Sequence, residues 1–208
     1  MTQIQPTVLL TAACLSIFLT ACTGPGAGSN YPADLAYEDQ NWKSSHNKPL
    51  AVGSDMITIE PGNPFSGATW TGPFPTDSYE LSLEATRLEG QDIFCGIVFP
   101  IGKDTCSLIL GGWDNSLLGM SMIDGQSAAE NVTSYPESFT NHTWSTVVLK
   151  VTSGSVSVTL NEKTVIDLQR DHHTFSLYPG LEMYEPFGFF TYNSKALIRN
   201  PTLRILKP

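Results

Sequence analysis

Apolar and polar residues alternate along most of the chain from about residue 55 onward, and this period of two predicts β-strands. The stretch from residue 78 to 89 shows the pattern most clearly. One face of that predicted strand carries Tyr79, Leu81, Leu83 and Ala85, and the other carries Glu80, Ser82, Glu84 and Thr86. The stretch DMITIEP, residues 55–61, alternates in the same way. Strands with one apolar face bury that face between two sheets.

The second half of the chain continues the pattern. Residues 144–168 predict two or three short strands with turns at Ser153-Gly154 and Asn161-Glu162, and residues 187–194 and 197–206 predict the last strands. No stretch has a convincing helical period, and no repeat of solenoid or propeller spacing is present. Roughly ten strands with regular turns predict an all-β domain, either a sandwich or a barrel.

Two cysteines flank a predicted hairpin in the stretch FCGIVFPIGKDTCSLILGGWD, residues 94–114. If Val98 faces Lys103 across a four-residue loop, Cys95 faces Cys106, and their Cβ atoms lie about 5 Å apart. The sequence therefore predicts a disulfide between Cys95 and Cys106, in line with an oxidising compartment outside the cytoplasm. The alternative is a pair of buried free thiols.

The Gly-Gly-Trp-Asp sequence of residues 111–114 follows the second predicted strand of this hairpin. Glycines at the end of a strand allow a tight turn or a close backbone approach. The indole of Trp113 could stack on a sugar ring, because its face is apolar and its N–H donates a hydrogen bond. The alternative is a core tryptophan.

The first residues form a separate segment. An apolar run covers residues 8–19 and ends in Leu19-Thr20-Ala21-Cys22, which looks like a bacterial lipobox, although Met1 to Thr7 contains no Lys or Arg. The sequence predicts a lipoprotein signal peptide (1–21), lipidation of Cys22, a flexible lipid-anchored segment (22–50) and a β-sandwich (51–208). The predicted location is the bacterial cell envelope, lipid-anchored at the outer membrane or the periplasmic face. The alternative is a chance hydrophobic N-terminus.

Charge and composition restrict the partners. The formal net charge is −9, from 20 acidic and 11 basic residues, which argues against nucleic acid and against electrostatic binding to anionic lipid. His172 and His173 are adjacent and would point to opposite faces of a strand, with no third ligand nearby in the sequence. We therefore predict no metal site and no cofactor.

A resemblance to a known family rests on three stretches. They are YELSLEATRLEGQDIFCGIVFPIG (79–102), CSLILGGWDNSLLGMSMIDGQSAAEN (106–131) and IRNPTLRIL (198–206). Together they resemble bacterial concanavalin A-like, laminin-G-like sandwiches of the 3-keto-disaccharide hydrolase type. The resemblance implies a jelly-roll β-sandwich and activity on sugars oxidised at the 3-position.

Two functions follow as hypotheses: cleavage of 3-keto-glycosides, or binding of a glycan or a surface without catalysis. The enzyme requires a base and stabilisation of an enolate. Candidate bases are Glu130, Asp124 and Glu84, and candidate binding residues are Trp113, Asp114, Asn131 and Glu80. Glu80 and Glu84 lie four residues apart on one strand face, about 13 Å, which is too far for a glycosidase carboxylate pair.

Overall fold

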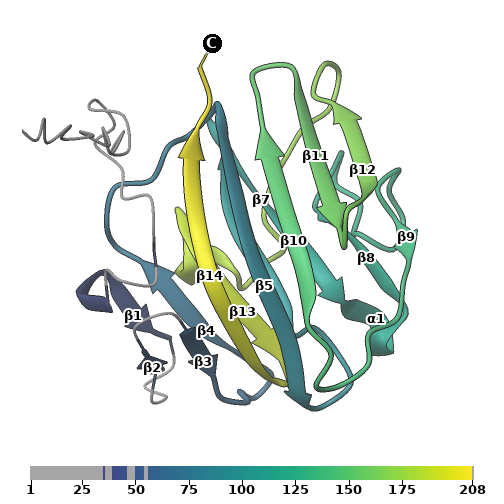
Figure 1. The fold of residues 1–208 in the computed structure, drawn as a ribbon. Coiled ribbons are helices and arrows are strands. Elements are labelled where there is room, and N and C mark those ends of the chain that lie inside the picture. Colours follow the sequence, from purple (N-terminus) through teal and green to yellow (C-terminus); the bar gives the residue numbers. More distant parts are fainter. Residues whose placement is uncertain (1–34, 36–38, 46–49, 54–55, 208) are drawn as a thin grey trace, which may run out of the picture.

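The computed structural model describes residues 35, 39–45, 50–53 and 56–207. Two antiparallel sheets pack face to face (Figure 1), which confirms the predicted jelly-roll-type β-sandwich. The first, here called the pocket sheet, contains β1 (Trp42–Ser44), β4 (Phe65–Trp70), β13 (Phe187–Tyr192), β6 (Cys95–Ile101), β7 (Asp104–Gly111), β8 (Leu117–Ser121) and β9 (Tyr135–Pro136), in that order. The second, the back sheet, contains β12 (Lys163–Gln169), β11 (Ser155–Leu160), β10 (Ser145–Val151), β5 (Tyr79–Glu89), β14 (Lys195–Ile205), β3 (Met56–Ile59) and β2 (Leu50–Val52).

The back sheet follows the predicted alternation. Strand β5 is central in it and buries every second side chain against the pocket sheet. Its polar face carries ion pairs to β14, in which Arg199 contacts Glu84 at 2.9 Å and Arg204 contacts Glu80 at 2.7 Å. The alternation of β5 thus correctly predicted which face points away from the core.

The pocket sheet differs because both of its faces are largely covered. All seven residues of β6 and all five of β8 are buried. Its inner face contributes to the main core, and its outer face packs under the segment that contains η2 (Glu182–Tyr184). Leu181 and Tyr184 of that segment pack with Val98, Ile109 and Phe190 in a second apolar cluster. The segment therefore covers part of the outer face, and Leu181 lines a pocket beside it.

The cysteine hairpin exists, but its register corrects the predicted disulfide. Ile101 pairs with Asp104 across a loop of two residues, and Gly102 has the positive φ (+68°) that such a loop requires. Cys95 therefore pairs with Leu110, and Cys106 with Phe99. Four positions separate the two cysteines along the ladder, about 13 Å, whereas a disulfide needs Cα atoms within about 7 Å. Both are free, buried thiols.

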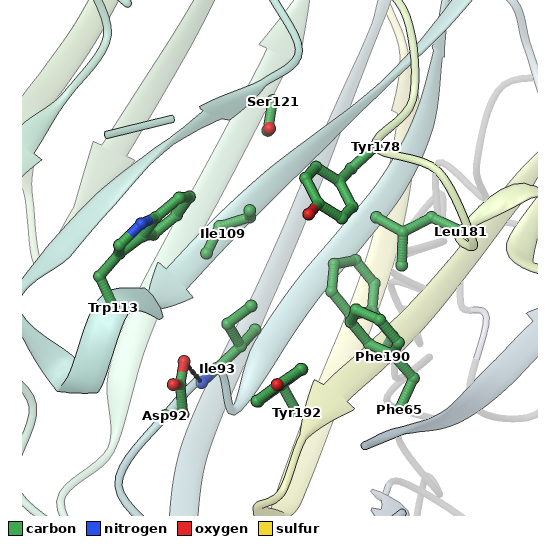
Figure 2. Close-up of a pocket in the computed structure, with 10 residues that line it drawn as sticks. All are labelled: Phe65, Asp92, Ile93, Ile109, Trp113, Ser121, Tyr178, Leu181, Phe190 and Tyr192. Carbon is green, nitrogen blue, oxygen red and sulfur yellow. Dashed lines mark hydrogen bonds between the residues drawn. The ribbon is translucent and has the colours of Figure 1, made fainter. Parts of the chain in front are cut away.

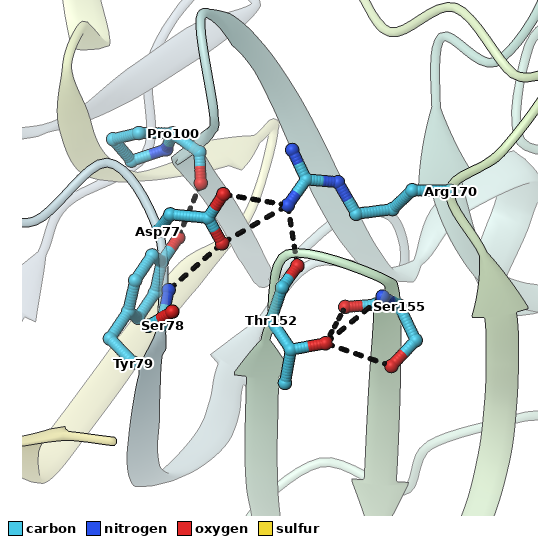
Figure 3. A network of polar contacts seen from close by, with 7 residues as sticks. All are labelled: Asp77, Ser78, Tyr79, Pro100, Thr152, Ser155 and Arg170. Carbon is cyan, nitrogen blue, oxygen red and sulfur yellow. Dashed lines mark hydrogen bonds and ion pairs between the residues drawn. The ribbon is translucent and has the colours of Figure 1, made fainter. Parts of the chain in front are cut away.

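A polar network closes one end of the sandwich (Figure 3). The Arg170 guanidinium donates to both carboxylate oxygens of Asp77, at 3.0 and 2.9 Å, and to the carbonyl of Thr152. The buried hydroxyl of Tyr79 donates to the carbonyl of Pro100 at 2.6 Å, and burial raises its pKa well above the usual value. These bonds join the β10–β11 turn, the start of β5 and the β6–β7 hairpin.

The sandwich begins before the predicted boundary at residue 51. The 3-10 turn η1 (Asp39–Asn41) leads into β1, which pairs Trp42 with Trp70 of β4. Leu35 is fully buried and accepts a hydrogen bond from the indole of Trp42. Leu35 and residues 39–45 thus pack or pair with the sandwich. The predicted signal peptide and Cys22 lie outside the described residues, and among the described ones no helix is long and apolar enough to span a membrane.

Candidate functional site

The candidate site is a pocket on the outer face of the pocket sheet (Figure 2). It has a volume of about 270 Å³. Its lining combines residues of four strands with residues of three connecting segments: Phe65, Asp92, Ile93, Ile109, Trp113, Ser121, Tyr178, Leu181, Phe190 and Tyr192. Most of these side chains are aromatic or aliphatic, so the pocket offers a mainly apolar surface with few polar groups.

The floor is fixed by aromatic packing on a glycine. Phe190 of β13 pairs with Gly96 of β6, and a Cβ at Gly96 would lie 2.3 Å from the Phe190 ring. The absence of a side chain there lets the ring lie over the neighbouring strand. Phe65 packs edge-on against Phe190, with ring centroids 5.9 Å apart, and against Tyr192 at 5.1 Å. These rings form a continuous apolar surface.

Trp113 and Tyr178 stand on opposite sides of the pocket, with Ile109 between them (Figure 2). Trp113 is 42% exposed and Tyr178 is 46% exposed, whereas the other Trp, Tyr and Phe side chains of the described residues are buried or half-buried. Tyr178 comes from the segment that crosses the outer face. Trp113 is therefore not a core residue, and two accessible rings flank the apolar floor.

The backbone that carries Trp113 is a left-handed turn. In α1 (Gly112–Asn115), Trp113, Asp114 and Asn115 have φ values of +51°, +59° and +63°. Each non-glycine residue in this region costs about 1 to 2 kcal/mol, so the surrounding structure must hold the turn. Asn115 does so directly. Its side chain accepts from the amide of Phe139 and donates to the Phe139 carbonyl, both at 3.0 Å.

A buried arginine connects this turn to the rest of the site. Arg87 is 3% exposed and donates to four oxygen atoms. These are Asn141 Oδ1 (2.6 Å), the Asp92 carbonyl (3.1 Å), Asn115 Oδ1 (3.1 Å) and the Phe139 carbonyl (2.7 Å). Burial lowers the pKa of Arg87 from its usual value. The guanidinium thus fixes three loops around one point beneath the Trp113 turn.

Asp92 supplies the carboxylate of the pocket. Its Oδ1 accepts the backbone N–H of Ile93 at 2.8 Å, and its Oδ2 has a long contact of 3.5 Å with the N–H of Asp114. Ser121 lies at another edge of the pocket and is fully buried. Its hydroxyl has no hydrogen-bond partner, and it points toward the pocket in Figure 2.

The structure places one of the four predicted binding residues in the lining of this pocket. Trp113 lines it. Asp114 follows Trp113 in the chain but is not among the lining residues, and Gln91 donates to its carboxylate at 3.0 Å. Asn131 is 7% exposed, and its side chain bonds the Met120 carbonyl and other groups of its own loop. Glu80 lies on the back sheet in the ion pair with β14.

The three predicted bases lie apart from one another. Glu84 is on the back sheet, where hydrogen bonds from Arg199 lower its pKa against the opposing effect of burial. Glu130 accepts from the hydroxyl of Ser127 on an exposed loop. Asp124 accepts the backbone N–H of residue 174 and contacts Nδ1 of His173 at 2.6 Å. None of the three lines the pocket.

Sequence reasoning did not identify Arg87, Asp92 or Tyr178. The signal for Arg87 was its position, because it continues the core-facing phase of Tyr79 to Ala85 along β5. A charged residue in that phase must find buried partners. Tyr178 had no comparable signal, since its segment has neither strand nor helix periodicity. Within the described part of the chain, no group of three or more His, Cys, Asp and Glu residues is arranged to hold a metal ion.

The fold and the pocket define a concanavalin A-like or galectin-like β-sandwich, and solved structures share this architecture. No family model matches the sequence, and no curated protein matches it. The carbohydrate binding module CBM66 from Bacillus subtilis is 13% identical, with 79% of this chain and 95% of that chain covered and a TM-score of 0.56. A Crh5 transglycosylase in complex with NAG is 11% identical, with coverages of 86% and 84% and a TM-score of 0.57. A Bacillus subtilis protein of unknown function with a galectin-like fold is 10% identical, with coverages of 85% and 98% and a TM-score of 0.54. At such identities the similarity shows the fold alone.

Proposed function

We propose that this domain binds a saccharide in the Trp113 pocket without cleaving it. The observation that carries the proposal is the pair of accessible rings, Trp113 and Tyr178, on opposite sides of an apolar floor. The C–H face of a sugar ring is apolar and packs on such aromatic surfaces, while its hydroxyls need a few polar partners. Asp92 and Ser121 are suitable partners at the edges of the pocket.

The distribution of carboxylates supports binding over glycoside hydrolysis. A glycosidase needs two carboxyl groups about 5 to 9.5 Å apart across the scissile bond. Among the residues that line the pocket, Asp92 is the one carboxylate, and Glu84 lies on the opposite face of the sandwich. The carbohydrate binding module CBM66 has a similar fold, and this analogy of fold supports a binding role.

Substitution of Trp113 by Ala tests the proposal. Loss of a stacking ring should weaken binding of a soluble oligosaccharide by about 1 to 3 kcal/mol without unfolding the domain, since the side chain is exposed. A panel of oligosaccharides titrated calorimetrically against the protein gives the affinity, and thermal melting gives the stability. Trp144→Ala is the matched control, because Trp144 lies away from the pocket, beside the back sheet. The guanidinium carbon of Arg199 lies 4.0 Å from the centroid of the Trp144 ring.

Equal binding by wild type and Trp113→Ala would remove the pocket from the proposal. A large loss of stability in Trp113→Ala would contradict the exposed position of the ring. Binding lost in Trp144→Ala but kept in Trp113→Ala would place the glycan on the back sheet instead.

Cleavage of 3-keto-glycosides is a second candidate, and one contact favours it. The Asp124 carboxylate holds Nδ1 of His173, which orients the other ring nitrogen as a potential base for the acidified proton beside a ketone. Incubation with a 3-keto-disaccharide and its unoxidised parent, followed by product analysis, tests it. Turnover of the keto form alone, lost in His173→Ala, would support catalysis. No turnover would leave the binding function as the better account.

We also propose that a lipid on Cys22 tethers the domain to the bacterial envelope, on the strength of the lipobox-like residues 19–22. Cys22→Ser should release the protein from membranes or leave its precursor uncleaved. Fractionation and mass measurement identical to wild type would reject the tether.

A further inference from the structure

We infer that the pocket selects a saccharide that carries a protonated amine, with Asp92 as the counter-ion. The inference rests on the proposed binding function and adds the class of sugar.

Asp92 has unused bonding capacity. Its Oδ1 accepts one short bond from the Ile93 amide, but its Oδ2 has only the long contact with the Asp114 amide. No Lys, Arg or His is among the residues that line the pocket. A charged donor on a ligand therefore meets a carboxylate that accepts no hydrogen bond from a side-chain cation, and such charge-assisted bonds are about twice as strong as neutral ones.

Arg87 is a cation that interacts electrostatically with the Asp92 carboxylate, but it donates no hydrogen bond to that carboxylate. Its guanidinium donates to the main-chain carbonyl of Asp92 rather than to its carboxylate, and its other donors go to amide and carbonyl oxygens. Asp114 is a second acidic residue near Asp92: its backbone N–H contacts Asp92 Oδ2 at 3.5 Å, and its carboxylate accepts from the neutral amide of Gln91. The two carboxylates outnumber the single guanidinium beside them, in a chain whose formal net charge is −9.

The aromatic rings add to this preference. The faces of Trp, Tyr and Phe carry negative potential and attract cations within about 6 Å. Trp113 and Tyr192 flank Asp92 in Figure 2, and Tyr178 faces them across the floor. An amine on a sugar ring would meet both the carboxylate and the ring faces while the C–H face of the sugar lies on Ile109. A neutral sugar makes the apolar contact with Ile109 but lacks the charged group that would interact with the carboxylate and the ring faces.

The Ser121 hydroxyl indicates a polar group at another edge of the ligand. It is buried, unpartnered and directed at the pocket, and a buried hydroxyl without a partner costs about 1 to 3 kcal/mol. A ring hydroxyl placed there would satisfy it. The pocket would therefore bind an amine beside Asp92 and a hydroxyl beside Ser121, a combination that an amino sugar provides and a simple aliphatic amine does not.

Three tetrasaccharides of the same β-1,4 linkage test the inference: the glucosamine tetramer, the N-acetylglucosamine tetramer and cellotetraose. Titration into the full chain at low salt and pH 6, where the glucosamine amine is largely protonated, gives three affinities. The glucosamine tetramer should bind about tenfold more tightly than cellotetraose, and added salt should reduce the difference. Asp92→Asn should abolish the preference and leave folding intact, because an amide oxygen can still accept the Ile93 N–H.

Asp167→Asn is the control, because it removes the same charge from an exposed position on β12 of the back sheet. Equal affinities for all three tetramers, lost in Trp113→Ala, would overturn the amine selectivity and keep the saccharide-binding function. A preference that Asp167→Asn reduces as much as Asp92→Asn would also overturn it, since net charge would then be the cause. Binding of none of the tetramers in the presence of an intact fold would overturn the inference and count against the proposed function as well.

Discussion

Replacement of Arg87 by Met should destabilise the domain and disorder the pocket together. Methionine keeps much of the apolar stem but has no donor for the four acceptor oxygens. Three of them retain another donor: the Asp92 carbonyl keeps Ser194, Asn115 Oδ1 keeps the Phe139 amide, and the Phe139 carbonyl keeps Asn115. Asn141 Oδ1 thus loses its bond from Arg87, and the loops that carry Asp92, Asn115 and Phe139 lose the guanidinium that binds them together.

The expected loss of unfolding free energy is about 3 kcal/mol. Four bonds at about 1 kcal/mol each set the scale, and the relief of the desolvated guanidinium charge offsets part of the loss. Urea denaturation followed by circular dichroism measures it, with an unchanged m-value as evidence of two-state unfolding. Arg87→Lys should recover only part of the stability, because one ammonium cannot reach acceptors spread around a planar guanidinium.

Arg204→Met is the matched control. Arg204 donates a hydrogen bond to Glu80, and its side chain is 68% exposed, so the change should cost less than about 0.5 kcal/mol. If Arg87→Met costs less than about 1 kcal/mol and leaves saccharide affinity unchanged, the argument that Arg87 positions the Trp113 turn is refuted.

Three further predictions concern other parts of the molecule. Cys95 and Cys106 should resist alkylation in the folded protein and react fully on unfolding, because burial raises the pKa of both thiols to about 12. Alkylation of native and of unfolded protein, followed by mass spectrometry, checks this. Resistance of the unfolded, unreduced protein to alkylation would indicate a disulfide. Asp124→Asn should destabilise the domain more at pH 7 than at pH 3, because hydrogen bonds, first from a backbone amide, lower the pKa of Asp124. The stability that this carboxylate contributes is present above its unfolded pKa of about 3.9 and is lost as pH falls through the folded value. A stability difference that is the same at both pH values would count against it. Gly96→Val should displace the Phe190 ring from the pocket floor and lower saccharide affinity, which calorimetry and a crystal structure of the variant would show.

The sequence predicted the sandwich because alternation is a local signal. In β5 a period of two separates the buried face from the face with Glu80 and Glu84, and the structure places both carboxylates outside the core. The prediction of the disulfide was wrong because the register of the β6–β7 hairpin depends on the length of its turn. A shift from a four-residue to a two-residue loop moves Cys106 from Cys95 to Phe99, and residue types alone do not distinguish the two loops.

The candidate site was only partly predictable for a related reason. Trp113 was recognised by its position after a strand and two glycines, but Asp92 and Tyr178 lie on connections without periodicity. Their approach to one another depends on tertiary contacts that are distant in sequence. One such contact is the pair of backbone hydrogen bonds between Met122 and Ser176, which fixes the start of the segment that carries Tyr178.

These contacts couple the pocket to folding. One side of the pocket rests on a left-handed turn that is held by Arg87 and Asn115, and the floor rests on a ring packed over Gly96. Each of these features costs free energy or requires a particular residue, and none is needed to bury the core between the two sheets. A saccharide that binds the native pocket would therefore stabilise the whole domain by mass action, by about 2.7 kcal/mol at a hundred times its dissociation constant. The rise in melting temperature with ligand should fall in parallel with affinity in variants of Trp113 and Asp92, which makes thermal shift a direct readout of the pocket.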